Sequence, residues 1–243
     1  MERVNSPWTI AEKILLQAYS SYTEAYMDSK GRVFKGISAG KSYDMLAPFF
    51  GMGNVFFKKA IGGIAAESGM RVLDLGCGTG KLLFALCERS HTQACFYGCD
   101  YSADQLKFAE GSKSRFTQEI TFIHASMDEL DFSDAHFDII MSSMALHAVN
   151  PGIRQKAIRE VARMLKNDGL FLLIESGRPR FGLISLMFST LGGLHKKDAY
   201  AHEIVDGYCR ESGLELMEES YLNSLVRRQL FIKRPQVIPY PSR

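Results

Sequence analysis

The sequence has little surplus of either charge. Its 243 residues include 29 Lys and Arg against 27 Asp and Glu, which gives a formal net charge of +2, and its basic residues cluster only in pairs. A nucleic-acid-binding surface normally shows as a basic face or stripe. We therefore expect no nucleic-acid partner.

Long apolar runs are also missing. No uninterrupted run reaches the roughly 18 residues that a membrane-spanning helix needs. The first residues lack the basic start and the apolar core of a secretory signal peptide. These absences predict a cytoplasmic protein without a spanning helix.

A framework of paired cysteines is absent too. Cys95 and Cys99 lie four residues apart on a predicted strand, about 13 Å from each other, which is too far for a disulfide or for two ligands of one zinc ion. We expect free or buried thiols, which suit a reducing compartment, and no metal site. The five cysteines are Cys77, Cys87, Cys95, Cys99 and Cys209.

The central part of the chain alternates between strand and helix patterns. This alternation predicts right-handed crossovers and a parallel sheet covered on both faces. A chain of this length can bury a core without disulfides or metal. The predicted strands span 71–75, 94–99, 120–124, 137–142 and 169–175, and the helices 80–89, 102–112 and 151–167 separate most of them.

The helix at 151–167 has the clearest ends. Asn150 can cap it, Pro151 suits its first turn, and Gly169 follows its last apolar residues. After the fifth strand we predict a helix at 198–212. Strands near 214–221 and 224–233 follow it and form an antiparallel hairpin across the short link "LNSL".

The segment before the first strand does not follow the strand–helix pattern. Ser6 and Pro7 open a predicted helix in which apolar residues recur at helical spacing. We therefore predict a helical cap over residues 1–65 and a main domain over 66–243, with 177–200 inserted after the fifth strand.

A glycine-rich elbow, "VLDLGCGTGKL", joins the first strand to its helix. It does not match a phosphate-binding P-loop, because Leu82 stands where Ser or Thr is required and Leu75 stands at the first glycine. It also misses the dinucleotide fingerprint by one position, since Lys81 occupies the place of the third glycine. A phosphate-bearing nucleotide is therefore disfavoured.

Asp74 ends the strand immediately before this elbow. A carboxylate would repel a pyrophosphate, but it attracts an ammonium group. S-adenosylmethionine carries an amino-acid moiety with such a group and no phosphates. The elbow therefore predicts S-adenosylmethionine as the ligand.

Four segments in order resemble the class I S-adenosylmethionine-dependent methyltransferases. These are the elbow, "FYGCDYS", "FIHASMDELDFSDAHFDIIMSSMALHAV" and "REVARMLKNDGLFLLIES", which together cover about 71–175. Upstream, "KSYDMLAPFFGMGNVFFKKAI" is similar to the entry segment of the ubiquinone/menaquinone-biosynthesis methyltransferases. The resemblance implies an α/β, Rossmann-like, doubly wound sheet of seven strands, in the order 3-2-1-4-5-7-6 with strand 7 antiparallel.

The resemblance also implies a set of cofactor-binding residues. Asp100 would bind the ribose hydroxyls, and Tyr101 would either cover the adenine or pack as an ordinary side chain. Where relatives have Asp for the adenine amino group, this chain has Ser126, with Asp128 as the nearest carboxylate. The expected set is Tyr43, Asp74, Gly76, Cys77, Gly78, Gly80, Asp100, Tyr101, Ser126, Met127 and Ser142.

His147 is the candidate catalytic residue, because the loop after the fourth strand faces the methyl group in this family. A base is needed only if the acceptor must lose a proton. The alternative is a structural histidine at a helix start. Weaker candidates from the variable segments are His195, His202, Tyr22 and Tyr26.

Residues 177–200 are apolar between basic ends. As a lid they imply a greasy or aromatic acceptor, and the less favoured alternative is contact with a membrane surface. We therefore predict in-line methyl transfer to a small, apolar or aromatic molecule, with S-adenosylhomocysteine as product, by a monomer or homodimer. The alternatives are a lipid or membrane-surface methyltransferase and a non-catalytic S-adenosylmethionine-binding protein.

Overall fold

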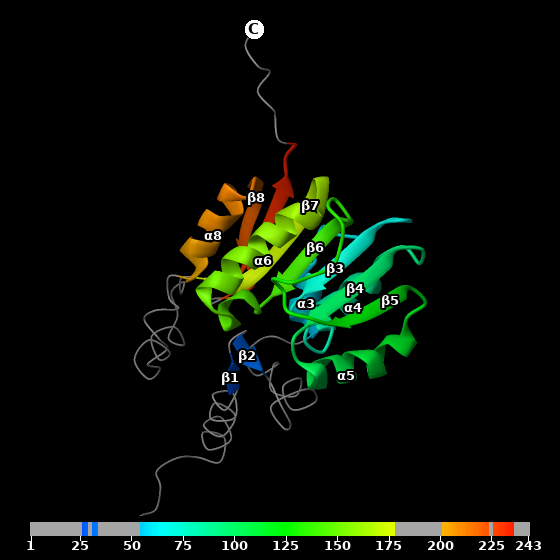
Figure 1. Cartoon of the computed structure of the whole chain (residues 1–243). Coiled ribbons are helices and arrows are strands. Elements are labelled where there is room, and N and C mark those ends of the chain that lie inside the picture. The colour runs from blue at the N-terminus through cyan, green and yellow to red at the C-terminus, as the bar shows by residue number, and fades with distance from the viewer. Residues whose placement is uncertain (1–25, 29–30, 34–53, 178–200, 224–225, 236–243) are drawn as a thin grey trace, which may run out of the picture.

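The computed structural model describes residues 26–28, 31–33, 54–177, 201–223 and 226–235. These residues build one seven-stranded sheet flanked by helices, together with a separate short hairpin (Figure 1). The strands of the large sheet are β3 (Arg71–Leu75), β4 (Cys95–Asp100), β5 (Glu119–His124), β6 (Phe137–Ser143), β7 (Leu165–Ser176), β8 (Leu214–Tyr221) and β9 (Val226–Lys233). The helices are α3 (Asn54–Ala60), α4 (Lys81–Cys87), α5 (Ala103–Ser112), η3 (Lys113–Arg115), η4 (Leu146–Ala148), α6 (Pro151–Met164) and α8 (Ala201–Glu211).

The strand order of the sheet is β5-β4-β3-β6-β7-β9-β8. The strands from β3 to β7 pair in parallel, and β9 is antiparallel to both of its neighbours. This confirms the predicted order 3-2-1-4-5-7-6 and the antiparallel last strand. The carboxyl ends of the five parallel strands meet at one edge, where open α/β sheets bind their ligands.

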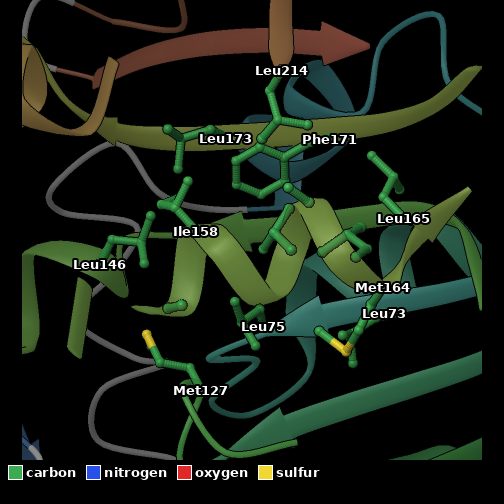
Figure 2. Packing of buried hydrophobic residues seen from close by; sticks show 14 of the residues in the cluster. Leu73, Leu75, Met127, Leu146, Ile158, Met164, Leu165, Phe171, Leu173 and Leu214 are labelled. Atoms are coloured by element: carbon green, nitrogen blue, oxygen red, sulfur yellow. The ribbon is translucent and has the colours of Figure 1, made fainter. Parts of the chain in front are cut away.

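Two apolar clusters hold the helices to the sheet, one on each face. On one face α6 and α8 pack over the sheet, and loop residues Leu146 and Met127 join the same cluster (Figure 2). On the other face α3 and α4 pack with Val72 and Ile139. Alternating side chains of each strand supply both clusters, so the middle of the sheet is buried on both sides.

Helix α6 begins as predicted but ends earlier. The Asn150 Oδ1 atom accepts a hydrogen bond from the Ile153 amide at 3.0 Å, and Pro151 is the first helical residue. The helix stops at Met164, because the fully buried Leu165 already pairs with Phe137 as the first residue of β7. Our prediction that Gly169 ends this helix was wrong, since that residue lies inside β7.

The flanking segments are described only in part. The hairpin of β1 (Tyr26–Asp28) and β2 (Gly31–Val33) is a feature of the N-terminal region that the sequence did not predict. Residues 178–200 of the predicted lid lie outside the described residues, as does the predicted helix from Ser6. The boundary at 65/66 stays a prediction. No helix among the described residues is long and apolar enough to cross a membrane.

Candidate active site

The glycine elbow lies at the carboxyl edge of the sheet, between β3 and α4. The amides of Gly76 and Cys77 both donate to the Cys99 carbonyl, at 2.8 and 2.9 Å, so the turn is anchored to β4. Gly76, Gly78 and Gly80 have φ angles of 74°, 54° and 81°. Side chains rarely tolerate this left-handed region, which explains the three glycines in so short a stretch.

The surroundings of these three glycines differ. A Cβ atom on Gly76 would lie 2.4 Å from the Ala145 Cβ, and one on Gly80 would lie 2.8 Å from the Phe84 ring. At Gly78 no described atom comes within 4 Å of the same position. Gly76 and Gly80 thus leave room for neighbouring protein atoms, whereas no described residue occupies the space beside Gly78. The approach of a ligand to these three glycines stays a prediction.

Asp74 is a buried carboxylate without a partner. Its side chain is 1% exposed, and neither carboxylate oxygen accepts a hydrogen bond from a described residue. Burial, followed by the nearby charge of Asp100, raises its pKa to about 7, and the backbone of Leu83 opposes only part of that shift. A buried anion of this kind is costly unless a cation or donors reach it. The buried Asp74 carboxylate is therefore suited to a positively charged ligand group.

Asp100 already holds the elbow in place. Its Oδ2 accepts from the Gly78 amide at 2.7 Å and its Oδ1 from the Ser102 amide at 2.8 Å. Burial raises the pKa of this carboxyl, although those two amides act in the opposite direction. Each carboxylate oxygen has a second lone pair, so Asp100 can still accept from a ligand hydroxyl.

The loop after β5 supplies a polar pair and an apolar side chain. The Ser126 hydroxyl donates to Asp128 Oδ1, and both residues are buried. Because its proton points to Asp128, the Ser126 oxygen can act as an acceptor. Met127 lies between them in sequence, with its Cε near Gly76. On the neighbouring strand end, Tyr101 stacks on His124 and is 39% exposed.

The loop after β6 turns sharply against the elbow. The Ser142 hydroxyl is fully buried and donates to the Leu75 carbonyl at 2.9 Å, so this side chain braces two strands. Met144 follows with φ at 53°, and its amide donates to the Ile174 carbonyl at 2.8 Å. This turn brings Ala145 into contact with the Gly76 position.

His147 lies in the same loop and pairs with a buried acid. Its Nδ1 atom is 2.8 Å from Glu175 Oε2, at the end of β7. The Arg154 side chain, also buried, donates to the carbonyls of Leu146 and Val149 at 2.7 and 3.1 Å. The sequence analysis missed Glu175 and Arg154, although a lone acid at the end of the apolar run "FLLIES" is a usable signal.

Some of the remaining predicted site residues are described by the structure, and others lie outside the described residues. Cys77 is buried within the elbow, and burial raises the pKa of its thiol well above the ordinary value. Its predicted contact with the cofactor stays a prediction. Tyr43 lies outside the described residues, as do Tyr22 and His195. The five cysteines are free.

Comparison with known proteins agrees with this geometry. Residues 72–169 match a family model described as a methyltransferase domain. A ubiquinone/menaquinone biosynthesis C-methyltransferase of Bdellovibrio bacteriovorus is 30% identical over 183 residues, which cover 70% of this chain and 77% of that protein. A demethylmenaquinone methyltransferase of Staphylococcus aureus is 28% identical over 160 residues, covering 65% and 64%.

The solved structures show the same fold. A SAM-dependent methyltransferase from Aquifex aeolicus aligns with a TM-score of 0.56 and 16% identity, over 69% of this chain and 84% of that one. The chain therefore belongs to the class I S-adenosylmethionine-dependent methyltransferases. Within that class it resembles the ubiquinone/menaquinone biosynthesis C-methyltransferases.

The described residues fit the cofactor that this family uses. S-adenosylmethionine carries an ammonium group, which complements the unpaired Asp74 carboxylate. Its ribose hydroxyls can donate to Asp100, and the open space beside Gly78 leaves room for close approach to the backbone. No phosphate is required, in agreement with the carboxylates at both strand ends.

Proposed function

We propose that the protein transfers a methyl group from S-adenosylmethionine to a small, apolar or aromatic acceptor by in-line displacement. The observation that carries this proposal is the juxtaposition of three features. Asp74 accepts no hydrogen bond from the described residues and lies near Asp100, whose carboxylate accepts from the Gly78 amide. The loop that bears His147 contacts the same elbow through Ala145. The cofactor supplies an activated methyl group, and the chain supplies the geometry.

Residues at different strand ends would bind different parts of S-adenosylmethionine. Asp74 would pair with the ammonium group, and the backbone from Gly76 through Cys77 to Gly78 would follow the ligand. Asp100 would accept from the ribose. Tyr101, Met127 and Ser126 would surround the adenine, with the Ser126 oxygen accepting from its amino group. Ser142 would contribute through its backbone, because its side chain is engaged.

The acceptor is proposed from two observations. The relatives are named for ubiquinone and menaquinone biosynthesis, and one of them for demethylmenaquinone. The second observation is that apolar Leu173 and Val205 lie among the polar residues beside His147. The names of the relatives favour an aromatic small molecule over a macromolecule, and apolar residues near His147 are compatible with such an acceptor.

The protein's main contribution would be orientation. Positive charge disappears as the methyl leaves its sulfonium, so strong stabilisation of a new charge is not required. Holding the acceptor atom in line with the methyl replaces a bimolecular encounter by an oriented one. The anchored elbow and the braced loop after β6 supply rigid walls for this purpose.

Calorimetry followed by a transfer assay tests the proposal. We expect binding of S-adenosylmethionine and S-adenosylhomocysteine but not of NAD or ATP. We also expect mass spectrometry to detect a methylated product from naphthohydroquinone or a simple phenol. Binding without transfer to any acceptor would support a non-catalytic binding protein. Transfer only in the presence of anionic lipid vesicles would support the membrane-surface alternative.

A further inference from the structure

Glu175 fixes one side of the His147 ring. The Oε2 atom lies 2.8 Å from His147 Nδ1, and Oε1 accepts from the Leu146 amide at 2.8 Å. The Nε2 atom of His147 makes no hydrogen bond with the part of the chain that the structure describes. The ring is 18% exposed and lines a cavity together with Leu173 and Val205. One ring nitrogen is thus engaged by an acid and the other remains available.

Glu175 is held as an anion. Burial by itself would raise its pKa, but His147 and the amides of Leu146 and His147 outweigh that effect and place the pKa below its ordinary value. A carboxylate at Nδ1 keeps the neutral ring's proton on Nδ1 and leaves the Nε2 lone pair free. The same carboxylate stabilises the imidazolium that forms when Nε2 takes a proton.

The backbone around His147 is held from the opposite side. The Arg154 guanidinium donates to three backbone carbonyls of this loop, those of Leu146, His147 and Val149, at 2.7, 3.4 and 3.1 Å. Glu175 therefore binds the amides of the loop and Arg154 binds its carbonyls. A side chain on a loop fixed in this way keeps one orientation, as proton transfer requires.

The other charged groups near this cavity are paired among themselves. Arg227 of β9 lines the cavity, but its guanidinium binds Asp206 of α8 and Glu219 of β8. Arg154 is engaged with carbonyl oxygens. Among the described residues, Glu175 is thus the anion that contacts the His147 ring.

We propose that His147 accepts a proton from the methyl acceptor, that Glu175 is its positioning residue, and that the acceptors are therefore molecules with an ionisable O–H or C–H group. This inference rests on the proposed function. It narrows the acceptor to phenols, hydroquinones, enols and related acids, and it disfavours tertiary amines and thioethers, which have no proton to lose.

The step balances without another reactant. The acceptor's bond to hydrogen breaks, and its electron pair forms the new bond to the methyl carbon. The electron pair of the broken sulfur–methyl bond stays on sulfur, which becomes a neutral thioether. The proton moves to Nε2 of His147, and solvent later removes it.

Nuclear magnetic resonance of the cofactor-free protein tests the pair without any turnover. In nitrogen-15-labelled wild type we expect the neutral form of the His147 ring to carry its proton on Nδ1, and the signal is assigned by its loss in His147→Ala. In Glu175→Gln the ring should lose this fixed tautomer. Glu218→Gln, on an exposed carboxylate that pairs with Arg228, is the matched control and should leave the tautomer unchanged.

Kinetics with acceptors of different acidity provide the second test. Removing a general base typically costs 10²–10⁴-fold in rate. We expect His147→Ala to lower kcat about 100-fold or more with phenol, and Glu175→Gln about tenfold. The losses should be much smaller with para-nitrophenol, which ionises without help. Cofactor affinity should stay within about twofold in both variants, and circular dichroism would show that both fold.

The outcomes separate this inference from the proposed function. Equal losses with phenol and para-nitrophenol, or an unchanged His147 tautomer in Glu175→Gln, would overturn the dyad while leaving methyl transfer intact. So would wild-type activity confined to pyridine and dimethyl sulfide. If the wild type binds S-adenosylmethionine but methylates none of these compounds, the proposed function fails, and this inference fails with it.

Discussion

Two buried carboxylates stand at the ends of parallel strands, and their surroundings are opposite. Asp74 lies near the end of β3 and accepts no hydrogen bond from the described residues, and its pKa is raised to about 7. Glu175 lies near the end of β7 with a histidine and backbone amides around it, and its pKa is lowered. The carboxylate without a partner is the one we propose to bind the ligand's ammonium group. The other is already held by His147 and by the Leu146 amide.

The two halves of the sheet repeat this contrast on a larger scale. On the β3–β5 side, backbone amides and glycines shape the elbow, and Asp74 has no hydrogen-bond partner among the described residues. On the β7–β9 side, buried arginines are paired with other protein groups. Arg228 donates to the carbonyls of Ala60 and Gly62, and Arg227 binds Asp206 through its two terminal nitrogens, while its Nε has no partner among the described residues. The first half therefore contains a buried carboxylate without a partner, and the second contains buried charges held in ion pairs.

The largest expected effect is at the open glycine. Gly78→Val should lower S-adenosylmethionine affinity at least 100-fold, because the branched side chain enters space that the ligand needs and imposes strain at positive φ. Gly213→Val is the matched control, since Gly213 also has a positive φ and no described atom within 4 Å of a Cβ. Calorimetry would check both variants. Equal losses of affinity would place the ligand away from Gly78.

Neutralising the two buried carboxylates should change stability in opposite directions. At about pH 8, Asp74→Asn should raise the cofactor-free protein's free energy of unfolding by about 1–2 kcal/mol, because an unpaired buried charge is removed. Glu175→Gln should lower it by about 2–4 kcal/mol, because a satisfied buried anion is lost. Urea denaturation measures both. A destabilised Asp74→Asn protein would mean that Asp74 has a partner after all.

The stability gained in Asp74→Asn should depend on pH. A carboxyl whose folded pKa is raised costs stability that grows as pH rises from its ordinary value of 3.8 to about 7. The advantage of Asp74→Asn should therefore shrink as the pH is lowered through that window. The destabilisation caused by Glu175→Gln should stay constant near neutral pH, because the lowered pKa of Glu175 keeps that carboxyl ionised there.

Cofactor affinity should depend on pH through Asp74. The carboxyl must lose its proton to pair with the ligand's ammonium, so wild-type affinity should rise on the order of tenfold between about pH 5.5 and pH 7. Above that range the ligand's own amino group begins to lose its proton. Calorimetry in buffers of different ionisation enthalpy would detect the released proton. A flat profile in the wild type, matching Asp74→Asn, would contradict the assignment.

The smallest expected effect concerns the adenine end. Ser126→Ala and Asp128→Asn should each weaken S-adenosylmethionine by about 0.5–1.5 kcal/mol, the range for one hydrogen bond. Because Asp128 acts through the Ser126 hydroxyl, the double variant should lose less than the sum of the two. Additive losses in a double-mutant cycle would show that Asp128 contacts the ligand independently.

Several features of the fold could be predicted from local patterns. The alternation of strand and helix segments gave the parallel sheet, and Asn150 with Pro151 gave the start of α6, because both depend on residues close in sequence. The end of α6 could not be predicted in this way. Leu165 extends because Phe137, on another strand, pairs with it, and that contact is not visible in the local pattern.

The candidate site shows the same division. Its cofactor side follows from the sequence, since Asp74, the glycines and Asp100 lie at strand ends that the topology brings together. The different surroundings of the glycines could not be predicted from the sequence, because they depend on where the side chains of Ala145 and Phe84 lie relative to Gly76 and Gly80.

What the sequence by itself determined is thus the class of protein, its strand order and the position of Asp74 and Asp100 at the strand ends. Only the tertiary structure decided which charges are paired. His147 and Glu175 are 28 residues apart, and Arg228 and Ala60 are 168 apart. Whether a buried charge is satisfied depends on distances across the folded sheet, which residue spacing along the chain does not specify.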